Sequence, residues 1–122
     1  MKTVFINLQK DEIKSSQEIP INCIIKIDSS FVDMGQYLNK NELGALILFE
    51  HHQIITTLNL TEVTPYVLLF FDANLIFKGA SYSLKSGIGR FTLETQYKTI
   101  LFLRLPHNLK LNTIINLSHD SY

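Results

Sequence analysis

The sequence predicts an all-β fold, a compact sandwich or barrel-like single domain over residues 1–122 with one or two short helices. Three observations support this prediction. The apolar runs are short and rich in β-branched and aromatic residues, turn residues separate them, and the strongest run, residues 66–71, is apolar at every position. At 122 residues the chain has the length of one domain, and no interdomain linker is visible.

The N-terminal part predicts two strands separated by a polar segment. Residues 4–8 are mostly apolar and favour a first strand. Residues 9–17 are polar and charged, which indicates a solvated loop. After Pro20, residues 21–28 contain several isoleucines, whose branched side chains favour a second strand.

A short helix is predicted next. Ser29 or Ser30 can cap its first turn, because a hydroxyl oxygen can accept a hydrogen bond from a free backbone N–H. Asp33 falls at the third or fourth position of this helix, and Gly35 can end it.

The middle of the chain supplies the most apolar strands. Residues 43–49 form one candidate, which the polar segment 50–52 stops, and residues 54–60 form a partly alternating second one. Residues 66–71 lack any polar alternation, which predicts a strand covered on both faces near the centre of the fold. Further elements are expected along the rest of the chain: a hairpin turn at 72–74 with a return at 75–77, a flexible loop at 85–90, strands at 91–93 and 99–105, and a short closing strand near 109–115.

Composition excludes several classes of function. The 11 basic and 11 acidic residues leave no basic excess to neutralise phosphates, so we expect no nucleic-acid partner. No apolar stretch approaches the roughly 20 residues that span a bilayer as a helix, and no secretory apolar segment is seen, so we expect no membrane partner and a cytoplasmic location. Cys23 is the single cysteine; its isoleucine neighbours predict a buried, inert thiol.

The sequence offers no convincing catalytic, metal or cofactor site. His51 and His52 are adjacent, so on a strand they point to opposite faces and rarely share one ion. The stretch 87–90 resembles a phosphate loop only superficially, because the full glycine pattern is missing. Most acidic residues flank apolar runs, which is typical of solvated turns. We therefore expect no catalytic residues, no metal and no cofactor, and an enzyme is disfavoured.

Two hypotheses of function remain. The first is a non-catalytic β domain that acts through protein contact or self-association, as a homodimer or with a protein partner. The alternative is a module that binds a small polar ligand in a pocket near the loops at 56–64 and 85–90. The residues that would line this pocket are a set of hydroxyl, amide and basic side chains, namely Thr57, Asn59, Thr61, Tyr66 and Arg90.

The order of several segments resembles the uncharacterised DUF192 family. Residues 35–38, 43–50, 65–74 and 98–106 are similar to the family's GLM-type turn, its GMLF-type strand, its PLDIxFID strand and its final YVLELP pattern. The resemblance spans about residues 22–117, and it implies the family's scaffold.

The polar signature of that family is missing from this chain. Residues 57–62 stand at the family's FWMKNT positions, with Leu60 in place of the lysine, and Val67 replaces the aspartate of PLD. The resemblance therefore implies a divergent member that has lost the family's polar centre, and no family ligand or activity is carried over.

Overall fold

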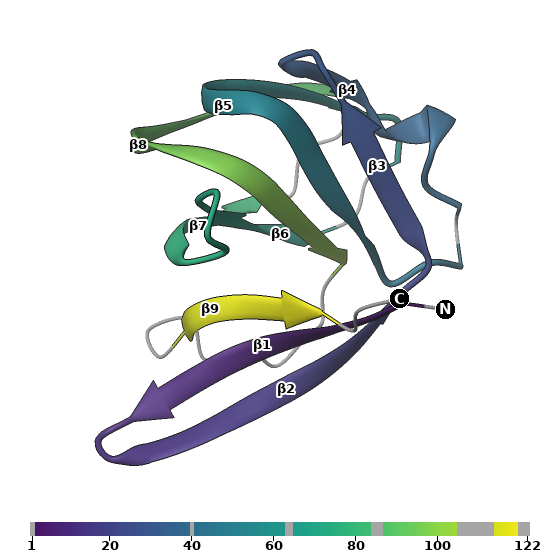
Figure 1. Ribbon diagram of the computed structural model, residues 1–122. Helices are drawn as coiled ribbons and strands as arrows, with labels where there is room; N and C mark the ends of the chain where they lie inside the picture. The colour runs from purple at the N-terminus through teal and green to yellow at the C-terminus, as the bar shows by residue number, and fades with distance from the viewer. Residues whose placement is uncertain (1, 40, 63–64, 84–86, 105–113, 120–122) are drawn as a thin grey trace.

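The computed structural model describes residues 2–39, 41–62, 65–83, 87–104 and 114–119, and these residues form an all-β domain (Figure 1). Its elements, in chain order, are β1 (Lys2–Lys10), β2 (Ile13–Ile21), β3 (Cys23–Ile27), β4 (Phe31–Asp33), the 3₁₀ helix η1 (Met34–Gln36), β5 (Gly44–Leu60), β6 (Tyr66–Phe71), β7 (Phe77–Ser83), β8 (Gly87–Arg104) and β9 (Ile114–His119). No described segment is a helix long and apolar enough to cross a bilayer.

The strands form two sheets. The smaller sheet has the order β2-β1-β9, and the larger one the order β3-β5-β8-β6-β7, with β4 also paired to β5. The long antiparallel strands β5 and β8 change register between Leu48 and Ile55, and there both strands turn back together (Figure 1). The larger sheet is thereby folded over itself, while the smaller sheet covers its other side (Figure 1). The architecture thus consists of stacked β layers.

Two hydrophobic cores fill the spaces between these layers. The first core lies inside the fold of the larger sheet, since Ile47 from the first half of β5 and Leu58 from its second half belong to the same cluster. The second core lies between the two sheets and joins Val4 and Ile6 of β1 to Leu101 and Leu103 of β8. A strand in the middle layer therefore contacts apolar side chains on both faces.

This arrangement explains why the strongest apolar run has no polar alternation. All six residues of β6 are buried. Tyr66, Leu68 and Phe70 belong to the first core. The alternate residues Val67 and Leu69 belong to the second core. The prediction of a strand covered on both faces is confirmed, because both faces of β6 meet a core.

The segment 9–17, predicted to be a loop, is instead the turn of a hairpin together with the strand residues on either side of it. Strands β1 and β2 pair along their full length, and Lys10 lies opposite Ile13 across the turn. Asp11 takes a positive φ of 57°, which aspartate tolerates better than most residues. The side chains near this turn are mostly exposed, so they lack the apolar alternation by which a strand is recognised.

The predicted helix after Ser29 is also wrong. Residues 31–33 form β4, whose backbone pairs with the second half of β5; the Thr57 N–H donates to the Ser30 carbonyl at 2.8 Å. Val32 and Met34 are buried while Phe31 is exposed, an alternation that a strand beside a core requires. The remaining helical turn is η1, which is three residues long.

Segments that the sequence predicts as separate strands and loops are continuous in the long strands β5 and β8. Residues 43–49 and 54–60 were predicted as separate strands, but β5 continues through 50–52, where His51 and His52 are exposed. The loops predicted at 56–64 and 85–90 are likewise strand at 56–60 and 87–90, while 63–64 and 84–86 lie outside the described residues. Pairing of residues 55–60 of β5 with residues 87–92 of β8 holds the segments predicted as loops extended.

The hairpin after β6 agrees with its prediction. The Asp72 carboxylate accepts hydrogen bonds from the backbone N–H of Asn74 at 2.9 Å and of Ile76 at 3.0 Å. Leu75 takes the positive φ of 64° that the turn needs. The closing strand begins at Ile114, and residues 109–113 lie outside the described part of the chain.

Candidate protein-contact face

The structure places three of the five predicted site residues on one face of the folded-back half of the larger sheet. Thr57 and Asn59 alternate along β5, and Arg90 on β8 lies directly opposite Thr57. Directly opposed residues of paired strands project to the same side of a sheet. Thr57, Asn59 and Arg90 therefore share a face, while their neighbours Thr56 and Leu58 are buried on the other side.

The other two predicted residues lie elsewhere. Tyr66 is buried in the first core, where its ring packs against those of Phe91 and Phe102 at centroid distances of 6.3 and 5.0 Å. Thr61 follows the end of β5 and lines a separate cavity. The five residues thus do not converge on a single pocket.

Three exposed apolar residues lie among the polar ones on this face. Phe31 on β4 lies opposite Thr57, and Ile88 on β8 lies opposite Asn59. Ile55 shares the same side of β5. The exposed fractions of Phe31, Ile55 and Ile88 are 45%, 44% and 68%. We call this surface the distal face; its residues are Phe31, Asp33, Ile55, Thr57, Asn59, Ile88, Arg90 and Thr92.

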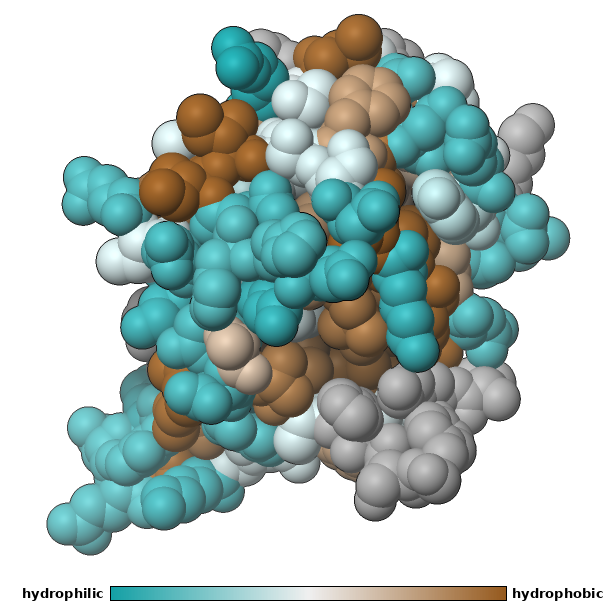
Figure 2. Space-filling model, turned by 45° about the horizontal axis from the view of Figure 1, so that its top comes forward, coloured by the Kyte–Doolittle hydropathy of each residue, from teal (hydrophilic) through white to brown (hydrophobic). Residues whose placement is uncertain are grey.

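The distal face is exposed because the smaller sheet covers only the opposite end of the molecule (Figure 1). Figure 2 brings the upper end of the molecule toward the viewer and shows hydrophobic patches within its hydrophilic surface. Large exposed apolar side chains on one face of a sheet, with charged residues beside them, are typical of a surface that contacts another protein.

The apolar members of this face are not identifiable from the sequence alone. The sequence predicts Phe31 in a helix and Ile88 in a flexible loop. Their common surface arises only from the pairing of β4 and β8 with the same half of β5. The local sequence carries no signal of that pairing.

A small cavity of about 190 Å³ lies between η1 and the end of β5. Its lining consists of four largely apolar positions and two polar ones, namely Met34, Gly35, Leu38, Leu60, Thr61 and Glu62. The Thr61 hydroxyl and the Glu62 carboxylate are the polar side chains of this lining. The cavity therefore overlaps one of the two segments, 56–64, where the sequence predicts a ligand pocket.

Arg104, at the end of β8, is the centre of a polar cluster near this cavity. Its guanidinium group donates to the carbonyl oxygens of Asn39, at 3.2 Å, and Glu42, and it forms an ion pair with Glu62. Only 12% of the Arg104 side chain is exposed. Through these contacts Arg104 connects the end of β8 to Asn39 and Glu42, which precede β5, and to Glu62, which follows it.

This cluster was missed by the sequence reasoning, in which Glu42 and Glu62 were expected in solvated turns. A usable signal is present, because Arg104 ends an otherwise apolar strand. Charged residues are rarely buried unless they are paired, so a buried arginine predicts acceptors nearby.

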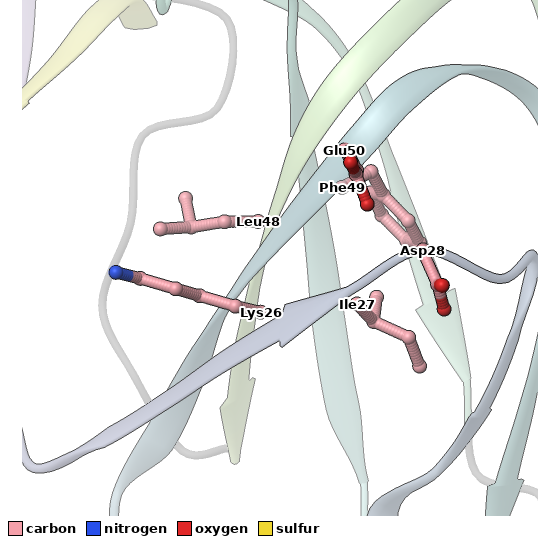
Figure 3. Close-up of a pocket in the computed structure, with 6 residues that line it drawn as sticks. All are labelled: Lys26, Ile27, Asp28, Leu48, Phe49 and Glu50. Atoms are coloured by element: carbon pink, nitrogen blue, oxygen red, sulfur yellow. The ribbon is translucent and has the colours of Figure 1, made fainter.

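A larger, open hollow of about 520 Å³ lies at the parallel edge formed by β3 and β5 (Figure 3). Lys26 and Leu48 point to one side of these strands, whereas Asp28 and Glu50 lie on the other side (Figure 3). The amine and the carboxylates therefore do not converge on one point. A binding site needs polar groups that converge, so we give this hollow no functional role.

The cysteine and the metal-ligating residue types were the remaining candidates for chemistry. Burial, together with the nearby carboxylate of Glu42, raises the pKa of the Cys23 thiol to about 11, so the thiolate is scarce at neutral pH. The thiol is buried and donates to the Tyr37 carbonyl at 3.4 Å. Within the described ranges, no three His, Cys, Asp or Glu side chains gather where they could hold a metal ion.

The comparisons with known proteins identify the fold but no family. No family model matches the chain, and no curated protein matches it. The fold is similar to that of a putative transcription regulator from Sinorhizobium meliloti, with a TM-score of 0.58 and 12% identity, over 98% of this chain and 94% of that one. At this identity the likeness concerns the fold alone, and the resemblance to DUF192 stays a prediction.

Proposed function

We propose that this chain is a non-catalytic β domain that acts through protein contact, and that the contact is made by the distal face. The observation that carries the proposal is the exposure of Phe31, Ile55 and Ile88 on one face of the larger sheet, beside Arg90. Removing such side chains from water stabilises a complex by roughly 25 cal/mol per Å² of apolar surface, before the costs of association.

The two buried cores support a role in presenting this face rather than in catalysis. Leu58 and Leu60, on the inner side of the second half of β5, pack in the first core and hold this half of the strand in place. Its outward residues are therefore held at defined positions, and a rigid, preorganised face loses less entropy on binding than a loop does.

Site-specific photo-crosslinking tests the proposal. We place a photo-crosslinking amino acid at Thr57, in the middle of the distal face, and in a control protein at Glu18, which is exposed on β2 of the smaller sheet. The full chain is then irradiated in the cells that express it. The proposal predicts discrete crosslinked species for position 57 but not for position 18; no crosslink at 57, or equal crosslinking at both positions, would contradict it.

A second candidate function rests on the cavity of about 190 Å³ beside η1. This cavity has room for a small molecule, with the Thr61 hydroxyl as a polar contact and Glu62, which is paired with Arg104, beside it. Thermal-shift screening against small polar metabolites tests it, since a ligand at 100 times its dissociation constant adds about 2.7 kcal/mol to the free energy of unfolding.

A cavity-filling variant makes this second test specific. Gly35 lines the cavity, so a Gly35→Leu substitution places a side chain in it. A genuine ligand of the cavity should lose its thermal shift with this variant and keep it with Thr57→Ala, which alters the distal face instead. A ligand that shifts both variants equally binds elsewhere.

The two positions at which the resemblance to DUF192 expects a polar centre do not come together in this chain. Leu60 is buried in the first core, and Val67 is buried in the second core. The two positions face opposite sides of the larger sheet, so this chain cannot bring them together as one polar site. A protein-contact role does not depend on that centre.

A further inference from the structure

We propose that the partner of the distal face is a second copy of this chain, joined to the first by a two-fold axis that pairs Asp33 of each copy with Arg90 of the other. This inference rests on the proposed function, because it names the occupant of the same face. It is carried by the arrangement of two apolar and two charged residues at the corners of that face.

Strand pairing fixes the four corners. One row across the sheet runs Phe31, Thr57, Arg90, and a second row runs Asp33, Asn59, Ile88. The apolar residues Phe31 and Ile88 therefore occupy one diagonal of the face. The charged residues Asp33 and Arg90 occupy the other diagonal.

Such a face is complementary to itself. A rotation of 180° about an axis along the apolar diagonal exchanges the two charged corners. Asp33 of each copy then faces Arg90 of the other copy, while Phe31 packs on Phe31 and Ile88 packs on Ile88. A two-fold interface of this kind uses the same patch on both copies and closes without leaving a free site.

Among the residues that the structure describes, neither Asp33 nor Arg90 has an ion-pair partner within its own copy. Two strand spacings across and two residues along separate Asp33 from Arg90 by roughly 12 Å, too far for an ion pair. The ion pairs formed among the described residues are Lys78 with Asp72 and Arg104 with Glu62. Asp33 and Arg90 thus keep their charges available for a partner.

The dimer should be weak and reversible. The face is three strands wide and about five residues long, which covers roughly 14 by 17 Å. Stable interfaces bury about 800 Å² on each partner, a good deal more than this. We therefore expect a dissociation constant in the range from about 1 μM to about 1 mM.

Reversing the charge of Asp33 or of Arg90 tests the proposed pairing between the two copies. The molar mass of each protein is measured by sedimentation velocity from about 10 μM to about 1 mM, with circular dichroism as a check of folding. The wild type should change from monomer to dimer with concentration. Asp33→Arg and Arg90→Asp each bring like charges together and should each weaken association by about tenfold or more. An equimolar mixture of the two variants should recover the dimer, because both charge pairs are restored between unlike copies.

Matched controls separate specific pairing from a general change of charge. Glu18→Arg and Lys14→Asp make the same changes of charge on exposed positions of β2, away from the distal face. Each control should associate like the wild type, and mixing the two controls should add nothing. Ile88→Asp serves as a further variant if Asp33→Arg fails to fold; Ile88 is 68% exposed, so its replacement should leave folding intact and abolish the dimer.

The outcomes distinguish this inference from the proposed function. A wild type that stays monomeric up to about 1 mM, or a mixture of charge variants that does not recover association, overturns the inference. If position 57 then still crosslinks to a different protein, the contact function stands with another partner. If position 57 crosslinks to nothing, both proposals are wrong.

Discussion

Replacing Gly44 by alanine should destabilise the protein strongly, because strands β5 and β8 approach too closely there for any side chain. A Cβ atom at Gly44 would lie 2.0 Å from the carbonyl oxygen of Phe102. This oxygen belongs to the backbone, so no side chain can rotate to relieve the contact. Real Cβ atoms essentially never lie closer than 3.0 Å to another heavy atom. The two strands would therefore have to separate by about 1 Å or more to make room for the new Cβ atom.

The size of the effect follows from two contributions. Overpacking a well-packed interior costs about 1–3 kcal/mol. Separation of the strands also weakens the neighbouring bond, in which the Arg104 N–H donates to the Leu43 carbonyl at 2.9 Å, and one such bond contributes about 0.5–1.5 kcal/mol. We expect a loss of about 2–4 kcal/mol in the free energy of unfolding. At this chain length that corresponds to a fall in Tm of roughly 8–16 °C.

Thermal unfolding followed by circular dichroism measures this effect, and Gly35 provides the matched control. A Cβ atom at Gly35 would lie 3.6 Å from the Asp33 carboxylate and 3.8 Å from the Thr61 hydroxyl, both ordinary contacts. Gly35→Ala should therefore change the stability by less than about 0.5 kcal/mol. A Gly44→Ala protein that melts within about 2 °C of both the wild type and Gly35→Ala would refute the packing argument.

Three further predictions concern buried and partly buried polar groups. Tyr97 and Thr56 are buried and share a hydrogen bond of 2.5 Å. Tyr97→Phe should therefore lower the free energy of unfolding, measured by chemical denaturation, by about 1–3 kcal/mol, and adding Thr56→Val should regain part of that loss. Equal stability of the wild type, the single variant and the double variant would contradict this pairing. The Cys23 thiol, with its pKa raised to about 11 from an ordinary value of 9.0, should react with a thiol reagent at pH 8 only after unfolding. Since the folded-state pKa lies above the unfolded value, the stability from this group is present below about pH 9 and decreases toward pH 11, which pH-dependent denaturation measures. Arg104→Met should lower the free energy of unfolding by roughly 1–3 kcal/mol. Glu62→Gln should lower it by less, because 38% of the Glu62 side chain is exposed. A larger loss for Glu62→Gln than for Arg104→Met would contradict the central role of Arg104 in this polar cluster.

The strands were predictable where their composition was extreme. Residues 66–71 have no polar member, and a strand of that kind needs a covering on each face, which the two cores supply. The segments 9–17 and 31–33 were mispredicted for a common reason. Their extended conformation comes from backbone pairing, of 13–17 with β1 across the turn and of 31–33 with the second half of β5, and the local composition does not report a pairing partner.

The candidate site was predictable only in part for the same reason. Thr57, Asn59 and Arg90 were chosen from the sequence, and the structure brings these three together. Tyr66 and Thr61 were chosen on the same grounds but lie in the first core and beside a cavity. Alternation along a strand tells which residues share a face, but it does not tell which other strand completes that face.

The amino-acid sequence by itself determined that this protein is an all-β domain with a strand at its centre that is buried on both sides. The free energy of burying six consecutive apolar residues leaves few alternatives. Tertiary structure alone decided that β5 and β8 turn back together, and so that Phe31, Ile88, Asp33 and Arg90 form one exposed face. That outcome depends on contacts between residues far apart in the chain, because the register and curvature of a sheet are set by all the strands that pair within it.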